Sequence, residues 1–257
     1  MTATGSEVVL VTGGASGLGE ATALHMVGTG RPVVVLDRDA AAAATMAERL
    51  GDHGAVVVGS VLDDDDVAAA IGAAATWGGV RWVVACAGGG EAGGRIVGRD
   101  GVPHDRGVFE RTIDLNVTGS FNTLRLCATA MASNEPDADG GRGAFVLVSS
   151  AAGYEGQIGQ IAYGSAKAAL IGMTLVAARD LASIGVRVNA IAPGVMDTAA
   201  WSQAPTDLKS ALEATVPFPR RLGAPTEFAR LAEHLCTNGY MNGHVARLDG
   251  ALRFGPR

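Results

Sequence analysis

The sequence predicts an α/β fold: one doubly wound parallel sheet of about seven strands, Rossmann-like, with helices on both faces. Three observations support this prediction. Short runs of apolar and β-branched residues alternate with helix-favouring segments along the chain. A glycine-rich turn joins the first of these runs to the first helical pattern. The 37 glycines, with only 5% aromatic residues, suit helices that pack closely on a sheet.

The expected strands are short buried runs bounded by helices or turns. The first, at 8–11, reads Val-Val-Leu-Val. The others lie at 32–36, 55–58, 82–86, 145–148, 187–191 and 245–248. No repeat of solenoid length interrupts them, so we expect one domain over residues 1–257.

The expected helices cover 18–27, 40–50, 63–77, 109–131 and 163–184. Asp39 suits the N-cap of the second helix. The third opens with four consecutive aspartates, 63–66. Such a run suits a metal or protein site, but carboxylates in a first turn also complement the helix dipole, and we favour this second interpretation.

Three stretches lack a regular pattern, at 88–107, 134–143 and 198–219. In a doubly wound sheet, ligands bind at the carboxyl ends of the strands. The first and third stretches follow the fourth and sixth strands, so we expect them to contact the substrate.

Composition narrows the classes of function. A net charge of −6 and a pI of about 5.3 argue against nucleic acid as a partner. Cys86, Cys127 and Cys236 lack the paired spacing of a zinc site, and the five histidines form no metal motif. No leader pattern or apolar run of membrane-spanning length is present, so we expect no membrane partner and a cytoplasmic location. A trimmed organellar transit peptide is an open alternative.

The glycine-rich turn at 12–19 has the strand, turn and helix context of a dinucleotide site. Its glycines allow backbone N–H groups to approach a pyrophosphate, and the helix start adds partial positive charge. The predicted contacts in this turn are Gly13, Ser16, Gly17, Leu18 and Gly19.

The second expected strand is followed by Asp37. A carboxylate at this position accepts hydrogen bonds from the adenosine ribose and repels a 2′-phosphate, which indicates NAD over NADP. The neighbouring Arg38 would favour the phosphate, but we interpret it as a solvent-facing charge.

Tyr163 and Lys167 lie four residues apart in a helix-favouring run. Residues at this spacing share one face of a helix. A nearby ammonium lowers the pKa of a phenol, so we expect Lys167 to bring Tyr163 towards acid–base function. Alone, such a pair is more often a surface feature; the glycine-rich turn and Ser150, thirteen residues earlier, favour a catalytic site.

Several motifs in order resemble the short-chain dehydrogenase/reductase family over essentially the whole chain. They are Thr12-Gly13-x-x-x-Gly17-x-Gly19, Ala87-Gly88, Asn116, Ser149-Ser150, Tyr163-x-x-x-Lys167 and Pro193-Gly194-x-x-x-Thr198. The resemblance implies a cofactor-binding half at about 7–150 and a catalytic and substrate half at about 151–257.

The resemblance also implies the catalytic roles. Tyr163 would be the acid/base on the substrate oxygen, and Ser150 would hydrogen-bond that oxygen. Lys167 would bind the nicotinamide ribose and lower the pKa of Tyr163. Asn116 would hold a water that links Lys167 to solvent.

Further cofactor contacts follow from the same resemblance. They are Ala87, Gly88, Pro193, Gly194, Val195 and Thr198, with Tyr163 and Lys167. Two places depart from the family pattern: Ala85-Cys86 replaces Asn-Asn, which loses the side-chain bonds of the first Asn, and Ser60 replaces the Asp that binds the adenine amino group. Adenine binding is then expected to involve Ser60 and the backbone of Val61.

Other segments, including 154–160 and 216–223, resemble the 3-hydroxyacyl-CoA dehydrogenase branch of this family. The implied substrate is a small hydrophobic molecule, an acyl-CoA or alternatively a steroid. Its implied contacts are Ser150, Gln157, Gln160, Tyr163 and Trp201. The resemblance also implies a homotetramer.

Two other functions are compatible with this fold. One is an NADPH-dependent 3-oxoacyl-carrier-protein reductase, against which Asp37 argues. The other is a non-enzymatic nucleotide-sensing or scaffold module. The complete set of Ser150, Tyr163 and Lys167 argues against this second alternative.

Overall fold

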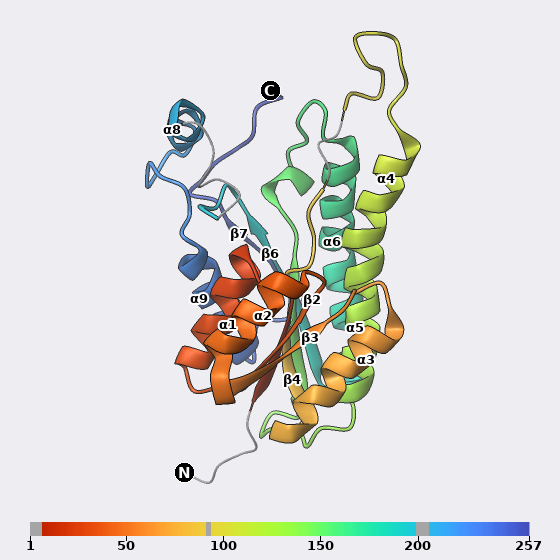
Figure 1. The fold of residues 1–257 in the computed structure, drawn as a ribbon, viewed down its shortest axis with the longest axis vertical. Coiled ribbons are helices and arrows are strands. Elements are labelled where there is room, and N and C mark those ends of the chain that lie inside the picture. The colour runs from red at the N-terminus through yellow and green to blue at the C-terminus, as the bar shows by residue number, and fades with distance from the viewer. Residues whose placement is uncertain (1–6, 91–93, 199–205, 257) are drawn as a thin grey trace.

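The protein, described here by a computed structural model over residues 7–90, 94–198 and 206–256, is built on one sheet of seven parallel strands (Figure 1). The sheet order is β3-β2-β1-β4-β5-β6-β7, and all six pairings are parallel. The strands are β1 (Val8–Thr12), β2 (Val33–Asp37), β3 (Gly54–Val58), β4 (Val80–Ala85), β5 (Gly143–Val148), β6 (Val186–Pro193) and β7 (Val245–Leu248). The predicted doubly wound sheet is confirmed.

Helices cover both faces of the sheet (Figure 1). α1, α2 and α9 lie on one face, and α3, α5 and α6 lie on the other. The α-helices are α1 (Gly17–Gly28), α2 (Ala40–Leu50), α3 (Asp64–Ala73), α4 (Arg106–Ile113), α5 (Gly119–Met131), α6 (Ile161–Asp180), α8 (Thr206–Ala214) and α9 (Pro225–Thr237). Short 3-10 turns occupy Gly51–His53, Ala74–Trp77, Ala151–Gly153 and Ala182–Ile184.

Alternate residues of the strands feed two separate apolar cores, because successive side chains point to opposite faces. Val9 and Val11 pack towards α1 and α9, with the fully buried Phe228. Leu10 lies in the other core with the fully buried Phe145. The sheet is therefore a rigid platform, and its carboxyl edge can hold a site.

The acidic run at the start of α3 stabilises the helix. Asp63 is the N-cap, and its carboxylate accepts hydrogen bonds from the N–H groups of Asp65 (2.8 Å) and Asp66 (3.2 Å). Asp39 caps α2 in the same way. Among the described residues, no group of three or more His, Cys, Asp or Glu side chains is arranged to hold a metal.

The helix expected at 109–131 begins earlier, at Arg106, and is interrupted by a π-helical segment at Asp114–Thr118. Asp105 caps its start through the N–H groups of Gly107 and Val108. π-Segments inside α-helices occur frequently at functional sites. This one carries Asn116.

α9 is not among the elements predicted from sequence. Its start has a clear physical signal: Pro225 in the first turn, and Glu227, whose carboxylate accepts a 2.8 Å hydrogen bond from the Ala224 N–H. Buried residues then recur at helical spacing: Phe228, Ala229, Ala232, Leu235 and Cys236. This pattern identifies an amphipathic helix and was overlooked.

α6 is the one described helix whose length and composition would also suit a membrane span. In the structure it packs on the sheet beside β5 and β6. Its buried face is rich in small apolar residues, including Ala162 and Ala166.

Candidate active site

The glycine-rich turn leaves the N-terminus of α1 open to an anion. Ser16 occupies the N-cap, but its side chain makes no capping hydrogen bond. Gly17 has a positive φ of 55°, a conformation that favours glycine, and a β-carbon there would lie 3.7 Å from the methyl carbon of Thr198. At Gly19, a β-carbon would lie 2.0 Å from the Gly13 carbonyl oxygen, so only glycine allows the helix to start this close to the turn.

Asp37 ends β2 beside this turn. Its carboxylate accepts hydrogen bonds from the N–H groups of Ala15 (2.9 Å) and Asp39 (3.0 Å). These contacts fix a negative charge next to the start of α1, while Arg38 is exposed. The predicted ribose contact is therefore held in place by the backbone around it.

The adenine side differs from the family pattern in the way the sequence indicated. The Ser60 N–H donates to the Asp66 carboxylate at 2.8 Å, and the Ser60 hydroxyl accepts from the Leu62 N–H at 3.2 Å. The Val61 carbonyl accepts a hydrogen bond from the Asn122 side chain at 2.9 Å. Asp66 and Asn122 were not predicted, and they shape this end of the site.

The segment after β4 packs tightly against the glycine-rich turn. The Thr12 hydroxyl accepts a 3.2 Å hydrogen bond from the Ala87 N–H. A β-carbon at Gly13 would lie 2.8 Å from the Ala87 α-carbon. The next residue, Gly88, packs against Asn116 and Lys167. A β-carbon at Gly88 would lie 2.8 Å from the Asn116 Oδ1 atom and 3.2 Å from the Lys167 Nζ atom.

Asn116 is fully buried, and the π-segment turns its side chain towards the loop after β4. Its amide nitrogen donates to the Thr112 and Gly89 carbonyls at 2.8 and 2.5 Å, and its amide oxygen accepts from the Gly89 N–H at 3.1 Å. The side chain therefore holds the loop at Gly89. Its predicted contact with a water is not tested by these bonds.

Ser150 and Tyr163 lie together across the sheet edge. Ser150 follows β5, and its hydroxyl accepts a 3.1 Å hydrogen bond from the Ala152 N–H. The phenol of Tyr163 projects from the first turn of α6, and the Ser150 side chain is near enough to lower its pKa. Two hydroxyl groups thus meet at one point, where they can share a substrate oxygen.

Lys167 lies one turn further along α6 and is 5% exposed. Its ammonium donates a 2.9 Å hydrogen bond to the Val148 carbonyl and lies 5.6 Å from the centre of the Tyr163 ring. The buried Ser149 hydroxyl donates to the Lys167 carbonyl at 2.7 Å, which ties α6 to the end of β5. Burial lowers the pKa of Lys167 to about 8.

The prediction that Lys167 lowers the pKa of Tyr163 is wrong for the protein alone. Burial raises the pKa of Tyr163, and the hydrogen bond from Ser150 offsets only part of that shift. The ammonium faces the ring and the Val148 carbonyl. Desolvation therefore sets the direction of the shift.

Cys86 lies near enough to Lys167 for the two groups to influence each other electrostatically, which the sequence alone does not indicate. Burial raises the pKa of Cys86 to about 12, although the charge of Lys167 opposes that shift. Its thiol is therefore protonated at neutral pH and uncharged beside the lysine.

The predicted cofactor contacts after β6 lie at the same carboxyl edge of the sheet. Pro193 ends the strand, and the Gly194 N–H donates to the Leu248 carbonyl at 2.9 Å. The Val195 carbonyl accepts from the Gly223 N–H at 3.0 Å. Thr198 lies next to Gly17, so both ends of the predicted cofactor site approach each other.

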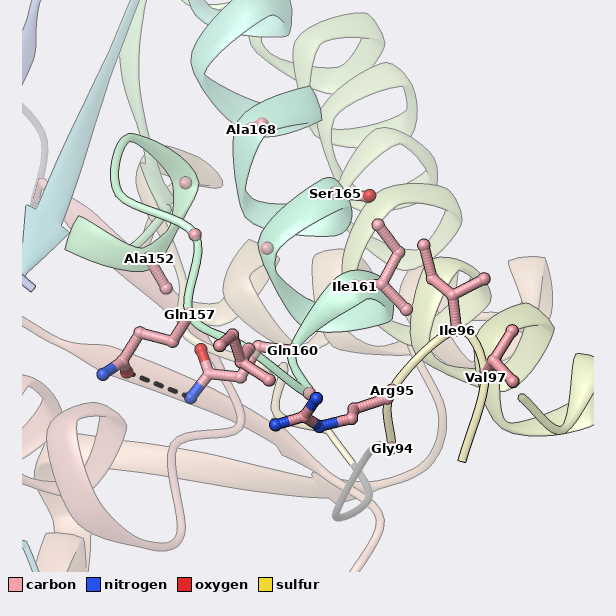
Figure 2. A pocket seen from close by; sticks show the side chains of 15 residues that line it. Gly94, Arg95, Ile96, Val97, Ala152, Gln157, Gln160, Ile161, Ser165 and Ala168 are labelled. Atoms are coloured by element: carbon pink, nitrogen blue, oxygen red, sulfur yellow. Dashed lines mark hydrogen bonds between the residues drawn. The ribbon is translucent and has the colours of Figure 1, made fainter. Parts of the chain in front are cut away.

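A pocket of about 640 Å³ opens beside the catalytic residues, between the 94–97 segment and the start of α6 (Figure 2). Gln157 and Gln160 lie along it, with a hydrogen bond of 3.3 Å between them. Its lining includes Ala152 and Gly164, close neighbours of the catalytic candidates in sequence, but not Ser150, Tyr163 or Lys167 themselves. Trp201, the other predicted substrate contact, lies outside the described residues.

Comparison with known proteins identifies the family. A family model described as short chain dehydrogenase matches residues 7–209. The chain belongs to the short-chain dehydrogenase family. Members of this family are oxidoreductases that use a nicotinamide cofactor, and this protein is an enzyme of that kind.

Individual short-chain dehydrogenases resemble the chain over nearly its whole length. Human 3-hydroxyacyl-CoA dehydrogenase type-2 is 42% identical over 250 residues, which cover 97% of this chain and 96% of that protein. The Drosophila melanogaster protein of the same name is 42% identical over 97% of this chain and 98% of its own. A crystal structure of 3-hydroxyacyl-CoA dehydrogenase type-2 from Mycobacterium avium superposes with a TM-score of 0.95, at 48% identity and 100% coverage of both chains.

Proposed function

We propose that this short-chain dehydrogenase is an NAD-dependent 3-hydroxyacyl-CoA dehydrogenase, which interconverts the secondary alcohol and the ketone at C3 of an acyl-CoA thioester. The observation that carries the proposal is that Ser150 and Tyr163 lie together beside the buried Lys167. The substrate class is supported by two type-2 3-hydroxyacyl-CoA dehydrogenases that match this chain from end to end.

The residues present fit a dinucleotide. The α1 N-terminus carries no side-chain cap, so its backbone N–H groups are available to a pyrophosphate. Asp37 places a fixed carboxylate where the adenosine ribose would lie. Its charge would repel a 2′-phosphate, which supports NAD over NADP.

The chain supplies the proton chemistry. In the reducing direction the Tyr163 phenol donates a proton to the ketone oxygen, and in the oxidising direction it accepts the alcohol proton. The Ser150 hydroxyl donates a hydrogen bond to that oxygen and fixes its position. When bound, NAD accepts the hydride that leaves the alcohol carbon, and NADH returns it to the ketone.

Lys167 would hold the nicotinamide ribose, and its charge would then stabilise the phenolate form of Tyr163. Its ammonium faces Gly88 on the cofactor side of α6, which supports this role. Asn116 would complete a proton path to solvent. Pro193, Gly194, Val195 and Thr198 would border the nicotinamide.

Two of the contacts proposed for the substrate, Gln157 and Gln160, lie between Ser150 and Tyr163 in the sequence. Gln160 Oε1 is buried and has no hydrogen-bond partner. Among the described residues, only two side-chain atoms are in this position. A buried acceptor without a partner favours a ligand that supplies a donor. Gln157 and Trp201 are proposed to contact the same substrate.

We also propose a homotetramer. The outer face of α6 exposes apolar side chains, with Leu175 at 45% and Val176 at 61% exposure. Phe121 on the neighbouring α5 is 53% exposed. An apolar stripe of this kind on two helices is typical of a surface that another copy covers.

The test is a panel of substrates and cofactors under one set of conditions. We expect acetoacetyl-CoA to be reduced with NADH, with a kcat/KM higher than that for NADPH. A keto-steroid tests the alternative substrate class. If neither ketone is reduced while small sugars or polyols are oxidised with NAD, the proposed substrate is wrong and only the dehydrogenase assignment remains.

A further inference from the structure

The segment between Ser150 and Tyr163 is anchored by one carboxylate. Glu155 and Arg247 form a paired contact, with Nη1–Oε1 and Nη2–Oε2 distances of 2.6 and 3.1 Å. The two side chains are only 20% and 22% exposed. Arg247 lies in β7, so the bond joins the segment after β5 to the far edge of the sheet. The guanidinium holds the pKa of Glu155 below its usual range.

Arg247 makes further contacts that fix its position. Its Nε donates to Asp249 at 2.6 Å, and its Nη2 donates to the Leu252 carbonyl at 3.1 Å. Its guanidinium also lies over the Tyr154 ring, 5.1 Å from the ring centre. The arginine is therefore a fixed anchor.

The C-terminal segment adds two bonds to the same stretch of chain. The Phe254 N–H donates to Glu155 Oε2 at 3.2 Å. The Ile158 N–H donates to the Pro256 carbonyl at 3.0 Å. Residues 154–160, which we call the substrate-side loop, are thus held by β7 and by the chain end.

The loop needs such an anchor because its own backbone is permissive. It contains Gly156 and Gly159, and the second of these has a positive φ of 90°. It carries both glutamines of the proposed substrate site, Gln157 and Gln160. A shift of the loop would move these side chains while leaving Tyr163, on the rigid α6, in place.

The anchor also touches the cofactor side of the site. A β-carbon at Gly194 would lie 2.9 Å from the Asp249 α-carbon, so the turn after β6 rests directly on the partner of Arg247. This contact is made by backbone atoms and does not depend on the charge of Glu155. Loss of that charge should therefore affect the substrate side selectively.

We propose that Glu155, held by Arg247, is a positioning residue for substrate binding: it sets the placement of the substrate-side loop and hence the KM for the acyl-CoA ketone. It acts through the loop and touches neither the reacting atoms nor the cofactor. The identity of the substrate in this inference rests on the proposed function. The anchoring role of Glu155 rests on its contacts with Arg247 and the C-terminal segment.

Glu155→Gln tests it, because the change keeps the size of the side chain and removes its charge. We expect the KM for acetoacetyl-CoA to rise about tenfold, which corresponds to about 1.4 kcal/mol. kcat should stay within about threefold and the Kd for NADH within about twofold, since Tyr163 and the dinucleotide site are unchanged.

The matched control is Glu227→Gln. Glu227 makes an equivalent paired contact with Arg221, at 2.8 and 2.8 Å, at the start of α9. Loss of that ion pair should lower the thermal stability to a similar extent and leave the KM unchanged. A purely structural role for Glu155 would give the two variants the same kinetics.

Hydrogen–deuterium exchange provides the second readout. In Glu155→Gln, exchange at residues 156–160 should accelerate, and exchange in the middle of α6 should not. If the wild type does not reduce acetoacetyl-CoA, the proposed function is wrong. Unchanged exchange at residues 156–160 in Glu155→Gln would show, independently of activity, that Glu155 does not anchor the loop. If the wild type is active but the variant keeps its KM, or loses kcat and NADH affinity together with KM, the positioning role is wrong.

Discussion

The ammonium nitrogen of Lys167 lies 5.6 Å from the centre of the Tyr163 ring, and the two groups titrate in an unexpected order. Burial lowers the pKa of Lys167 to about 8 and raises the pKa of Tyr163. In the protein alone, the lysine therefore loses its proton before the tyrosine does. At neutral pH the phenol is protonated and ready to donate to a ketone.

NADH binding should weaken as the pH rises through about 8. The ammonium form of Lys167, which prevails below its pKa of about 8, makes the stronger charge-assisted hydrogen bond to a ribose hydroxyl. We expect the Kd for NADH, followed by fluorescence titration, to rise about fivefold between pH 7 and pH 9. Lys167→Met should bind more weakly and show no such dependence. A Kd that is constant over this range in the wild type would contradict the role of the charge.

Asp37→Ala should relax the preference for NAD. The variant removes the charge that would repel a 2′-phosphate, so the ratio of kcat/KM values for NADH and NADPH should fall about tenfold. Asp37→Asn removes the same charge and should lower the ratio as well, although its single amide oxygen can keep only one of the two hydrogen bonds, which reach different carboxylate oxygens from the Ala15 and Asp39 N–H groups. If the wild type already prefers NADPH, the assignment of this carboxylate is incorrect.

Gly88→Ala should damage the site at the point where three elements meet. The added β-carbon would lie 2.8 Å from the Asn116 amide oxygen and 3.2 Å from Lys167 Nζ, so both side chains must move. We expect a loss of about 1–3 kcal/mol in the free energy of unfolding and weaker NADH binding.

Gly72→Ala is the control for that change, because a β-carbon there has no neighbour within 4 Å. In the helix α3 it should stabilise the protein by about 0.5–1 kcal/mol, measured by urea unfolding. Equal effects of the two substitutions would show that the crowding around Gly88 is unimportant.

Val176→Glu should dissociate the proposed homotetramer. The side chain is solvated in a separate chain, but a second copy on this face would bury an unpaired charge. Light scattering at micromolar concentration should give a lower mass for the variant than for the wild type. Leu62→Glu, at 46% exposure in the connection between β3 and α3, should leave the mass unchanged. A monomeric wild type would rule out the tetramer.

Much of the fold could be predicted because its signals are local. The apolar runs mark the strands within a few residues, and Asp39 and Asp63 act as caps where helix starts were expected. Tyr163 and Lys167 are one turn apart on α6, so their spacing alone placed them together.

Other features depend on contacts that no local pattern contains. The pKa of Tyr163 is set by burial under neighbouring loops. The pairing of Glu155 with Arg247 joins residues 92 positions apart. The π-segment at Asn116 forms where its side chain bonds the loop after β4, which sequence periodicity does not reveal.

The most direct test is the reduction of acetoacetyl-CoA by NADH in the wild type and in Tyr163→Phe, followed by the loss of NADH absorbance. The wild type should turn over, and the variant should lose at least about a thousandfold in kcat, because its ring has no proton to donate. NADH should still bind to the variant, since the phenol oxygen is the only atom removed. A wild type that does not reduce the thioester, or a variant within about tenfold of it, would contradict the account.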